Sequence, residues 1–143
     1  AASRHFFIQC GVPPWHETAR TMQPIEEYGK GKTKPYGVPD PITGKTYYGR
    51  GFVQLTWKDN YKKAGILVGA DLVNEPELAL DLAYSTKILV EGMTSGLFTG
   101  KKLSNYFNDE VTDPISARKI VNGRDKAELI ASYYHIFLDA IIN

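Results

Sequence analysis

Acidic side chains near the N-terminus are the residues of this chain most suited to chemistry. Glu17 lies in the run Trp-His-Glu-Thr-Ala, and Glu26 and Glu27 follow Pro24 at the edge of a long loop. Hydrolysis of a glycosidic bond needs two carboxyl groups, because one protonates the leaving oxygen while the other activates water or attacks the anomeric carbon. Separations of about 6.5–9.5 Å between the two groups suit the inverting reaction.

The distance between these carboxyl groups depends on the backbone that joins them. In a continuous helix over residues 17–27 they would lie about 15 Å apart along the axis. Pro24 disfavours such a helix, since its ring biases the preceding residue away from helical backbone. The chain can then turn and bring Glu27 across a cleft towards Glu17. Glutamates of this kind are also common on solvated surfaces, and the residues alone leave that alternative open.

Other chemistry is poorly supported by the sequence. Gly44 begins a Gly-Lys-Thr run like the end of a phosphate-binding loop, but Pro39 stands where that motif needs its first glycine. One cysteine and three histidines give no metal-ligand spacing, so we expect neither a metal nor a cofactor. Cys10 and His16 are a conceivable nucleophile pair, although the apolar Phe-Phe-Ile-Gln-Cys run favours a core position for the cysteine.

Length and composition indicate one ordinary globular domain over residues 1–143. The formal net charge is +1, with 43% hydrophobic and 23% charged residues. This charge balance argues against a nucleic-acid partner, which would need many uncompensated Lys and Arg. The apolar stretches are far shorter than the ~20 residues of a membrane span.

The elements that must position the carboxyl groups are mostly helical. Residues 29–51 are rich in glycine and proline, which predicts a long ordered loop or a small β-hairpin. Apolar periodicity and capping residues predict helices over residues 3–10, 57–68, 74–96, 113–122 and 125–141. The predicted buried faces are Trp57, Tyr61, Ala64 and Val68 on the helix over 57–68, Leu78, Leu82, Leu89 and Met93 on that over 74–96, and Ile130, Tyr133, Phe137 and Ile141 on the last.

Three motifs together carry a resemblance to a known family. The segment 47–61 reads Tyr-Tyr-Gly-Arg-Gly-Phe-Val-Gln-Leu-Thr-Trp-Lys-Asp-Asn-Tyr, with His-Glu-Thr at 16–18 and Ile-Val-Asn-Gly at 120–123. In this order they resemble the family 19 glycoside hydrolases, most closely the bacterial and phage endolysin branch. The resemblance covers roughly residues 15–141.

The resemblance implies roles for the residues that match the family's catalytic positions. The general acid falls on Glu17. The base that activates water falls best on Glu27, with Glu26 as a close rival. The hydroxyl that positions this water falls on Thr56, where many members have serine.

The resemblance also implies a set of substrate-binding residues. Gln54 and Asn60 match positions that bind sugar hydroxyls and acetamido groups, and Asn122 matches an asparagine on the cleft floor. Arg50 is expected to orient or charge-pair near the acid. Tyr48 is expected to contact the sugar, with its neighbouring tyrosine in the core.

The implied fold is mainly α and lysozyme-like, with two lobes, a cleft, and the long loop or small β-hairpin beside it. The implied function is hydrolysis of β-1,4 bonds in N-acetylhexosamine polymers by an inverting mechanism. Peptidoglycan cleavage by a phage-type endolysin is the first expectation, and chitin hydrolysis is an alternative. A non-catalytic glycan-binding or structural module with an impaired site is the other alternative.

The region before the acid departs from the family's pattern. Only 16 residues precede Glu17, so we expect the supporting lobe to be shortened or rearranged. A single cysteine cannot form the disulfides of secreted plant members, which favours synthesis in a reducing cytoplasm. With no signal peptide, we expect a monomeric enzyme made in a host cytoplasm that acts on the cell wall after release.

Overall fold

The computed structural model describes residues 9–11, 14–16, 21–121 and 126–142 of the chain. Its helical elements are η1 (Pro35–Gly37), α2 (Lys58–Val68), η2 (Pro76–Leu80), α3 (Leu82–Ser95), η3 (Leu103–Asn105), η4 (Ser116–Ile120) and α4 (Ala127–Ile142). The described residues contain isolated β-bridges outside these elements and no named strand. The mainly helical class predicted from the sequence is confirmed.

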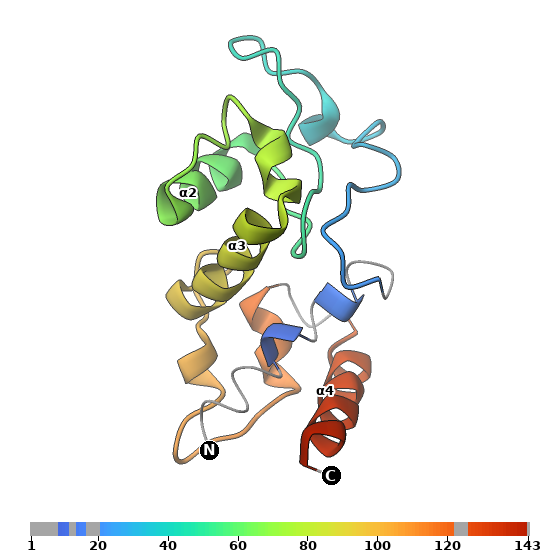
Figure 1. The fold of residues 1–143 in the computed structure, drawn as a ribbon, viewed down its shortest axis with the longest axis vertical. Helices are drawn as coiled ribbons and strands as arrows, with labels where there is room; N and C mark the ends of the chain where they lie inside the picture. The colour runs from blue at the N-terminus through green and yellow to red at the C-terminus, as the bar shows by residue number, and fades with distance from the viewer. Residues whose placement is uncertain (1–8, 12–13, 17–20, 122–125, 143) are drawn as a thin grey trace.

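Helix α3 joins two hydrophobic cores. Figure 1 shows α2 beside α3 at the end of the molecule that carries the long loop, and α4 at the opposite end. Ile88 of α3 packs with Tyr61 of α2 in one core. Leu89 of the same helix packs with Ile130 and Tyr134 of α4 in the other core.

Two of the predicted helices are shorter than expected. The predicted helix over 74–96 is interrupted at Asp81, whose side chain accepts hydrogen bonds from the N–H groups of Ala83 and Tyr84 and so begins α3. The preceding turns form the separate 3-10 helix η2. In place of the predicted helix over 113–122, the described residues form the short 3-10 helix η4. Asp113 precedes η4, and its side chain accepts a hydrogen bond from the N–H of Ser116, the first residue of η4.

The buried faces also differ in part from the prediction. Trp57 precedes α2 and is 50% exposed, while Leu82 at the start of α3 is 59% exposed. On α4 the fully buried aromatic ring belongs to Tyr134 rather than Tyr133, and Ile141 is exposed. The predicted helix over 3–10 falls largely outside the described residues. In the N-terminal segment the structure describes residues 9–11 and 14–16, and both stretches are helical.

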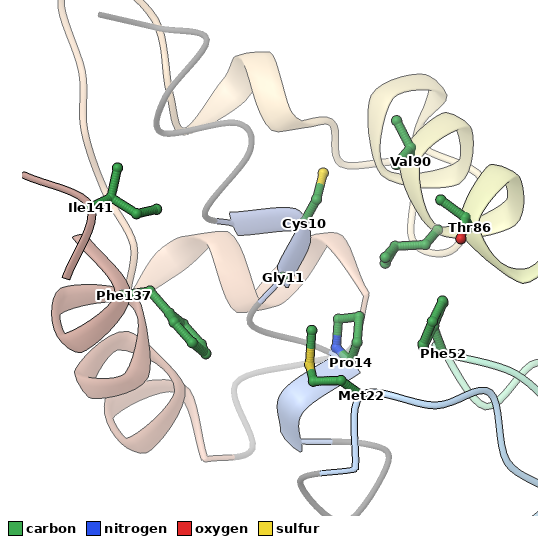
Figure 2. A pocket seen from close by; sticks show the side chains of 10 residues that line it. Cys10, Gly11, Pro14, Met22, Phe52, Thr86, Val90, Phe137 and Ile141 are labelled. Atoms are coloured by element: carbon green, nitrogen blue, oxygen red, sulfur yellow. The ribbon is translucent and has the colours of Figure 1, made fainter. Parts of the chain in front are cut away.

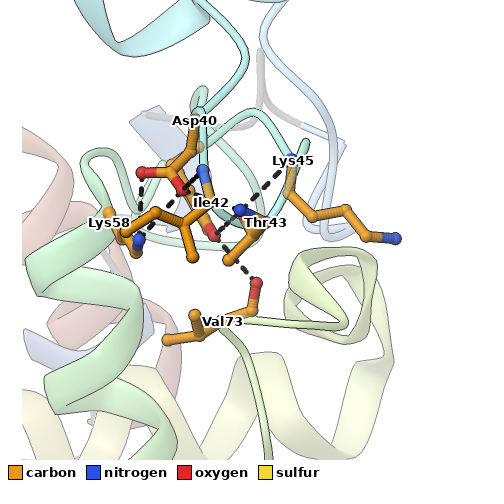
Figure 3. Close-up of polar contacts among 7 residues, drawn as sticks. Asp40, Ile42, Thr43, Lys45, Lys58 and Val73 are labelled. Carbon is orange, nitrogen blue, oxygen red and sulfur yellow. Dashed lines mark hydrogen bonds and ion pairs between the residues drawn. The ribbon is translucent and has the colours of Figure 1, made fainter.

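The long loop over residues 29–51 is ordered by a polar network around Asp40 (Figure 3). The Asp40 carboxylate accepts the N–H groups of Ile42 and Thr43 at 3.0 and 2.9 Å, and it pairs with Lys58 at 2.9 Å. The hydroxyl of Tyr47 donates to the carbonyl oxygen of Val73 at 2.9 Å. These contacts fasten the loop to the start of α2 and to the segment that follows α2.

None of the described helices is long and apolar enough to cross a membrane.

Candidate functional site

Glu27 is held against the backbone of Gly49 by two hydrogen bonds. Its N–H donates to the Gly49 carbonyl oxygen at 2.8 Å, and its Oε2 accepts the Gly49 N–H at 3.0 Å. The hydroxyl of Tyr36 also donates to Oε2, at 3.3 Å. Two donors, the Gly49 N–H and the Tyr36 hydroxyl, therefore fix one carboxylate oxygen of Glu27.

Glu26 has a different environment, although it is the adjacent residue. Its carboxylate accepts the Tyr48 hydroxyl at 2.9 Å, pairs with Lys30 at 3.3 Å, and lies 3.9 Å from Nε of Arg50. Desolvation raises the pKa of Glu26, but the hydrogen bonds from Tyr48 and Lys30 and the charges of Lys30 and Arg50 outweigh it. The pKa of this carboxyl is therefore below its usual range. The ion pair with Lys30 therefore belongs to Glu26, the rival of Glu27 for the base.

Arg50 is the buried centre of this network. The side chain is 5% exposed, and its Nη1 donates to the Thr46 carbonyl oxygen and to the Tyr61 hydroxyl, both at 3.0 Å. Its guanidinium lies 3.7 Å from the centroid of the Tyr48 ring, in cation–π geometry. Because Tyr48 is itself only 8% exposed, the two side chains pack on each other and support Glu26.

Gln54, Thr56 and Asn60 line one pocket of about 110 Å³. The Gln54 amide donates to the carbonyl oxygens of Ile25 and Gly51 at 2.9 and 3.0 Å. The Asn60 amide donates to the Thr56 carbonyl oxygen at 2.9 Å, one turn back at the start of α2. The structure therefore brings together three residues that the sequence assigned to water positioning and sugar binding.

Gly49 connects this pocket to Glu27. A Cβ atom at Gly49 would lie 2.8 Å from Oε2 of Glu27 and 2.9 Å from Oε1 of Gln54. The carboxylate and the carboxamide oxygen therefore converge on the same glycine, and no side chain fits between them. Glu27 and the Gln54 pocket thus meet at Gly49, and together we call them the candidate site.

Two predicted site residues lie outside the described residues. These are Glu17, the expected acid, and Asn122, the expected cleft-floor asparagine. Val121, which precedes Asn122 in the chain, lines the same pocket as Gln54. The assignments of Glu17 and Asn122 stay predictions.

Sequence reasoning missed Tyr36 and misplaced Trp57. Tyr36 lies in the glycine- and proline-rich loop, where no periodicity marks its role, yet its hydroxyl contacts Glu27. Trp57 was expected in the core, but it packs edge-on against Tyr36 with 5.4 Å between ring centroids. In the sequence, Trp57 continues the helical spacing of Tyr61 and Ala64. In the structure it precedes α2 and has a φ of 72°, so its side chain does not lie on the buried face of that helix.

A separate apolar pocket of about 350 Å³ lies between α3, α4 and the N-terminal segment (Figure 2). Cys10, Phe52, Leu89 and Phe137 are among the residues that line it. Burial raises the pKa of the Cys10 thiol to about 11, which makes it a poor nucleophile. A sugar site needs converging polar groups, so this pocket does not fit one.

Residues 27–93 match the family described as Chitinase class I, the glycoside hydrolases of family 19. This part of the chain is therefore similar to the family 19 chitinases. The matched range begins at Glu27 and includes Tyr48, Gln54, Thr56 and Asn60. Glu17 and Asn122 lie outside it.

Similar proteins include plant chitinases. Chitinase 3 of Oryza sativa subsp. japonica is 42% identical over 68 residues, which are 44% of this chain and 21% of that protein. Inactive chitinase-like protein 1 of Hevea brasiliensis is 48% identical over 48 residues, 33% of this chain and 15% of that protein. This chain thus aligns with about a fifth or less of these relatives.

A solved structure of a bacterial family 19 chitinase is also similar. It covers 93% of this chain and 75% of its own chain, with 23% sequence identity and a TM-score of 0.46.

Proposed function

We propose that this chain hydrolyses β-1,4 glycosidic bonds of N-acetylhexosamine polymers. The observation that carries the proposal is the fixed carboxylate of Glu27 beside the pocket of Gln54, Thr56 and Asn60. A base for an inverting reaction must be held within reach of a water molecule, which must in turn lie next to the bound sugar. The chitinase names of the plant relatives favour chitin as the polymer.

Glu27 is the residue to which we assign the base. Its Oε2 accepts hydrogen bonds from Gly49 and Tyr36, which orients the carboxylate and leaves Oε1 to take the proton from water. Thr56 would hold that water through its hydroxyl. Gln54 and Asn60 would bind the hydroxyl and acetamido groups of the sugar.

Glu26, Tyr48 and Arg50 are assigned a supporting role. Arg50 and Tyr48 are buried and bind Glu26 rather than presenting a free face to a sugar. We propose that this network fixes the backbone on which Glu27 stands. Glu17 remains the proposed general acid, on the resemblance of its His-Glu-Thr motif.

Product analysis tests the proposal. The purified protein and its Glu17→Gln variant are incubated with chitohexaose and, separately, with purified peptidoglycan, and the anomer of the first product is followed by NMR. The wild type is expected to cleave chitohexaose with inversion, whereas Glu17→Gln binds the sugar without cleaving it. Cleavage by Glu17→Gln near the wild-type rate, or retention of configuration, would contradict the assignment.

The two substrates also separate the finer alternatives. Cleavage of peptidoglycan but not of chitohexaose would assign the chain to cell-wall lysis, the first expectation from the sequence. Binding of either glycan by the wild type without any product would instead identify a non-catalytic module. The name of the Hevea brasiliensis relative shows that a chitinase-like protein can be inactive.

A further inference from the structure

Trp57 presents a large aromatic side chain to solvent from an unfavourable backbone. The indole is 50% exposed, and the φ of 72° lies in the left-handed region that side chains other than glycine rarely adopt. The surrounding contacts impose this conformation, since the Trp57 N–H donates to the Tyr47 carbonyl oxygen at 2.9 Å. Strained backbone of this kind is concentrated at functional positions.

Another pocket, of about 260 Å³, opens beside the indole. Its aromatic lining consists of Tyr36, Tyr47 and Trp57, and three prolines, Pro35, Pro39 and Pro41, are among its other walls. The Tyr36 and Trp57 rings meet at 75°, so the edge of one ring supports the other. The two rings therefore form one apolar wall of the pocket.

The polar groups of this pocket are electrically balanced. Asp40 and Lys58 both line it, and they pair with each other at 2.9 Å. Lys58 has three N–H donors, of which two reach the Asp40 oxygens at 3.0 and 2.9 Å. The third donor is available to a hydroxyl or carbonyl oxygen, and the paired charges favour a neutral ligand over an anion or a cation.

We propose that the Trp57 pocket binds a further N-acetylhexosamine unit of the polymer, away from the bond that is cut. This inference rests on the proposed function. A pyranose ring has an apolar C–H face, which fits the indole, and polar edges, which fit the Lys58 donor.

The position of Tyr36 links this pocket to the candidate site. Its hydroxyl binds Oε2 of Glu27 at 3.3 Å, and its ring packs against Trp57. A sugar on the indole therefore lies across Tyr36 from Glu27. A short oligosaccharide bound at Gln54 and Asn60 does not need this pocket, whereas a longer chain can occupy both.

Calorimetric binding in a Glu27→Gln background tests the inference without requiring turnover. Chitohexaose and chitobiose are titrated into this parent and into a version that also carries Trp57→Ala. Loss of the aromatic contact is expected to weaken chitohexaose binding about tenfold and chitobiose binding less than about twofold. Trp57→Tyr, which keeps a ring, should retain most of the affinity.

Ile66→Ala is the matched control, because Ile66 is 76% exposed on α2 and does not line the Trp57 pocket. It should bind both sugars like the parent. Equal chitohexaose affinity with and without Trp57→Ala would overturn the inference, as would failure of the parent to bind chitohexaose. Normal cleavage by the wild type with no effect of Trp57→Ala would refute only the pocket. A tenfold effect without cleavage by the wild type would refute only the proposed function.

A fluorescence measurement keeps the test independent of whether Trp57→Ala folds. The chain has two tryptophans, Trp15 and Trp57. Chitohexaose should shift or quench the emission of the Glu27→Gln parent, and Trp57→Phe should lose that change. An unaltered sugar-induced change in Trp57→Phe would contradict the inference.

Discussion

Glu27 and Gly49 exchange two hydrogen bonds, one through the Glu27 N–H at 2.8 Å and one through its Oε2 at 3.0 Å. Gly49 thus anchors both the backbone and the side chain of Glu27, the proposed base. Gly49 also lies against Oε1 of Gln54. The absence of a side chain at Gly49 is what lets Glu27 and Gln54 approach each other.

Replacing Gly49 by alanine should damage activity more than stability. The added methyl group would lie 2.8 Å from Oε2 of Glu27 and 2.9 Å from Oε1 of Gln54, and both are ends of flexible side chains that can move away. We expect kcat on chitohexaose to fall about 10- to 100-fold, because misplacement by about 1 Å costs that much. The free energy of unfolding should fall by about 1–2 kcal/mol.

Gly29→Ala is the control for this change. No atom lies within 4 Å of a Cβ at Gly29, and Gly29 is not among the glycines with positive φ. Its activity and stability should match the wild type. Wild-type kcat in Gly49→Ala would show that the close approach has no catalytic role.

The Glu26 network should make stability depend on pH in a defined direction. The pKa of Glu26 is lowered in the folded protein, so its stabilising contribution is present above the pKa of the unfolded chain and is lost as the pH falls through the folded value. Glu26→Gln should therefore be less stable than the wild type at pH 7. Chemical denaturation should show the difference shrinking as the solution is acidified, and a difference independent of pH would argue against the ion-pair network.

Asp40 should also make the stability of the protein fall at low pH. Hydrogen bonds from the Thr43 N–H and from Lys58 lower the pKa of Asp40 from 3.8 to about 2. Its contribution to stability is then complete above about pH 4 and is lost as the pH falls towards about 2. Asp40→Asn should lower the unfolding free energy at pH 7 and converge with the wild type near pH 2. A persistent difference at pH 2 would contradict this.

Cys10 should react slowly in the folded protein. Burial raises the pKa of its thiol from 9.0 to about 11, which lowers the thiolate fraction near pH 8 about a hundredfold. Reaction with a disulfide reagent should be correspondingly slow in buffer and fast in denaturant. Rapid reaction of the native protein would show that the thiol is not buried in the apolar pocket.

The grouping of Gln54, Thr56 and Asn60 could be predicted because these residues are close together in the sequence. Gln54, Thr56 and Asn60 lie within seven consecutive residues, and the turn that leads into α2 places them on one pocket. The adjacent Glu26 and Glu27 could not be separated by sequence, because one distinguishing partner of each comes from a residue 22 positions further along the chain. The hydrogen bonds to Tyr48 and Gly49 distinguish them.

The fold was predictable where apolar periodicity and caps agree. Gly96, the last residue of the predicted helix over 74–96, ends α3 in the left-handed conformation. The break at Asp81 was not foreseen, since its capping role competes with a pattern that continues through it. Trp57 was misplaced because periodicity does not report that a residue precedes a helix with a positive φ.

The most direct test of the proposed function compares two adjacent variants, Glu27→Gln and Glu26→Gln, in the hydrolysis of chitohexaose. Both changes remove one carboxylate from the same turn, so the comparison separates chemistry from support. Glu27→Gln should reduce kcat at least about a hundredfold, because general-base catalysis contributes about 10²–10⁴-fold. Glu26→Gln should keep most of the wild-type kcat at pH 7. Substantial turnover by Glu27→Gln, with loss of turnover in Glu26→Gln, would contradict the account.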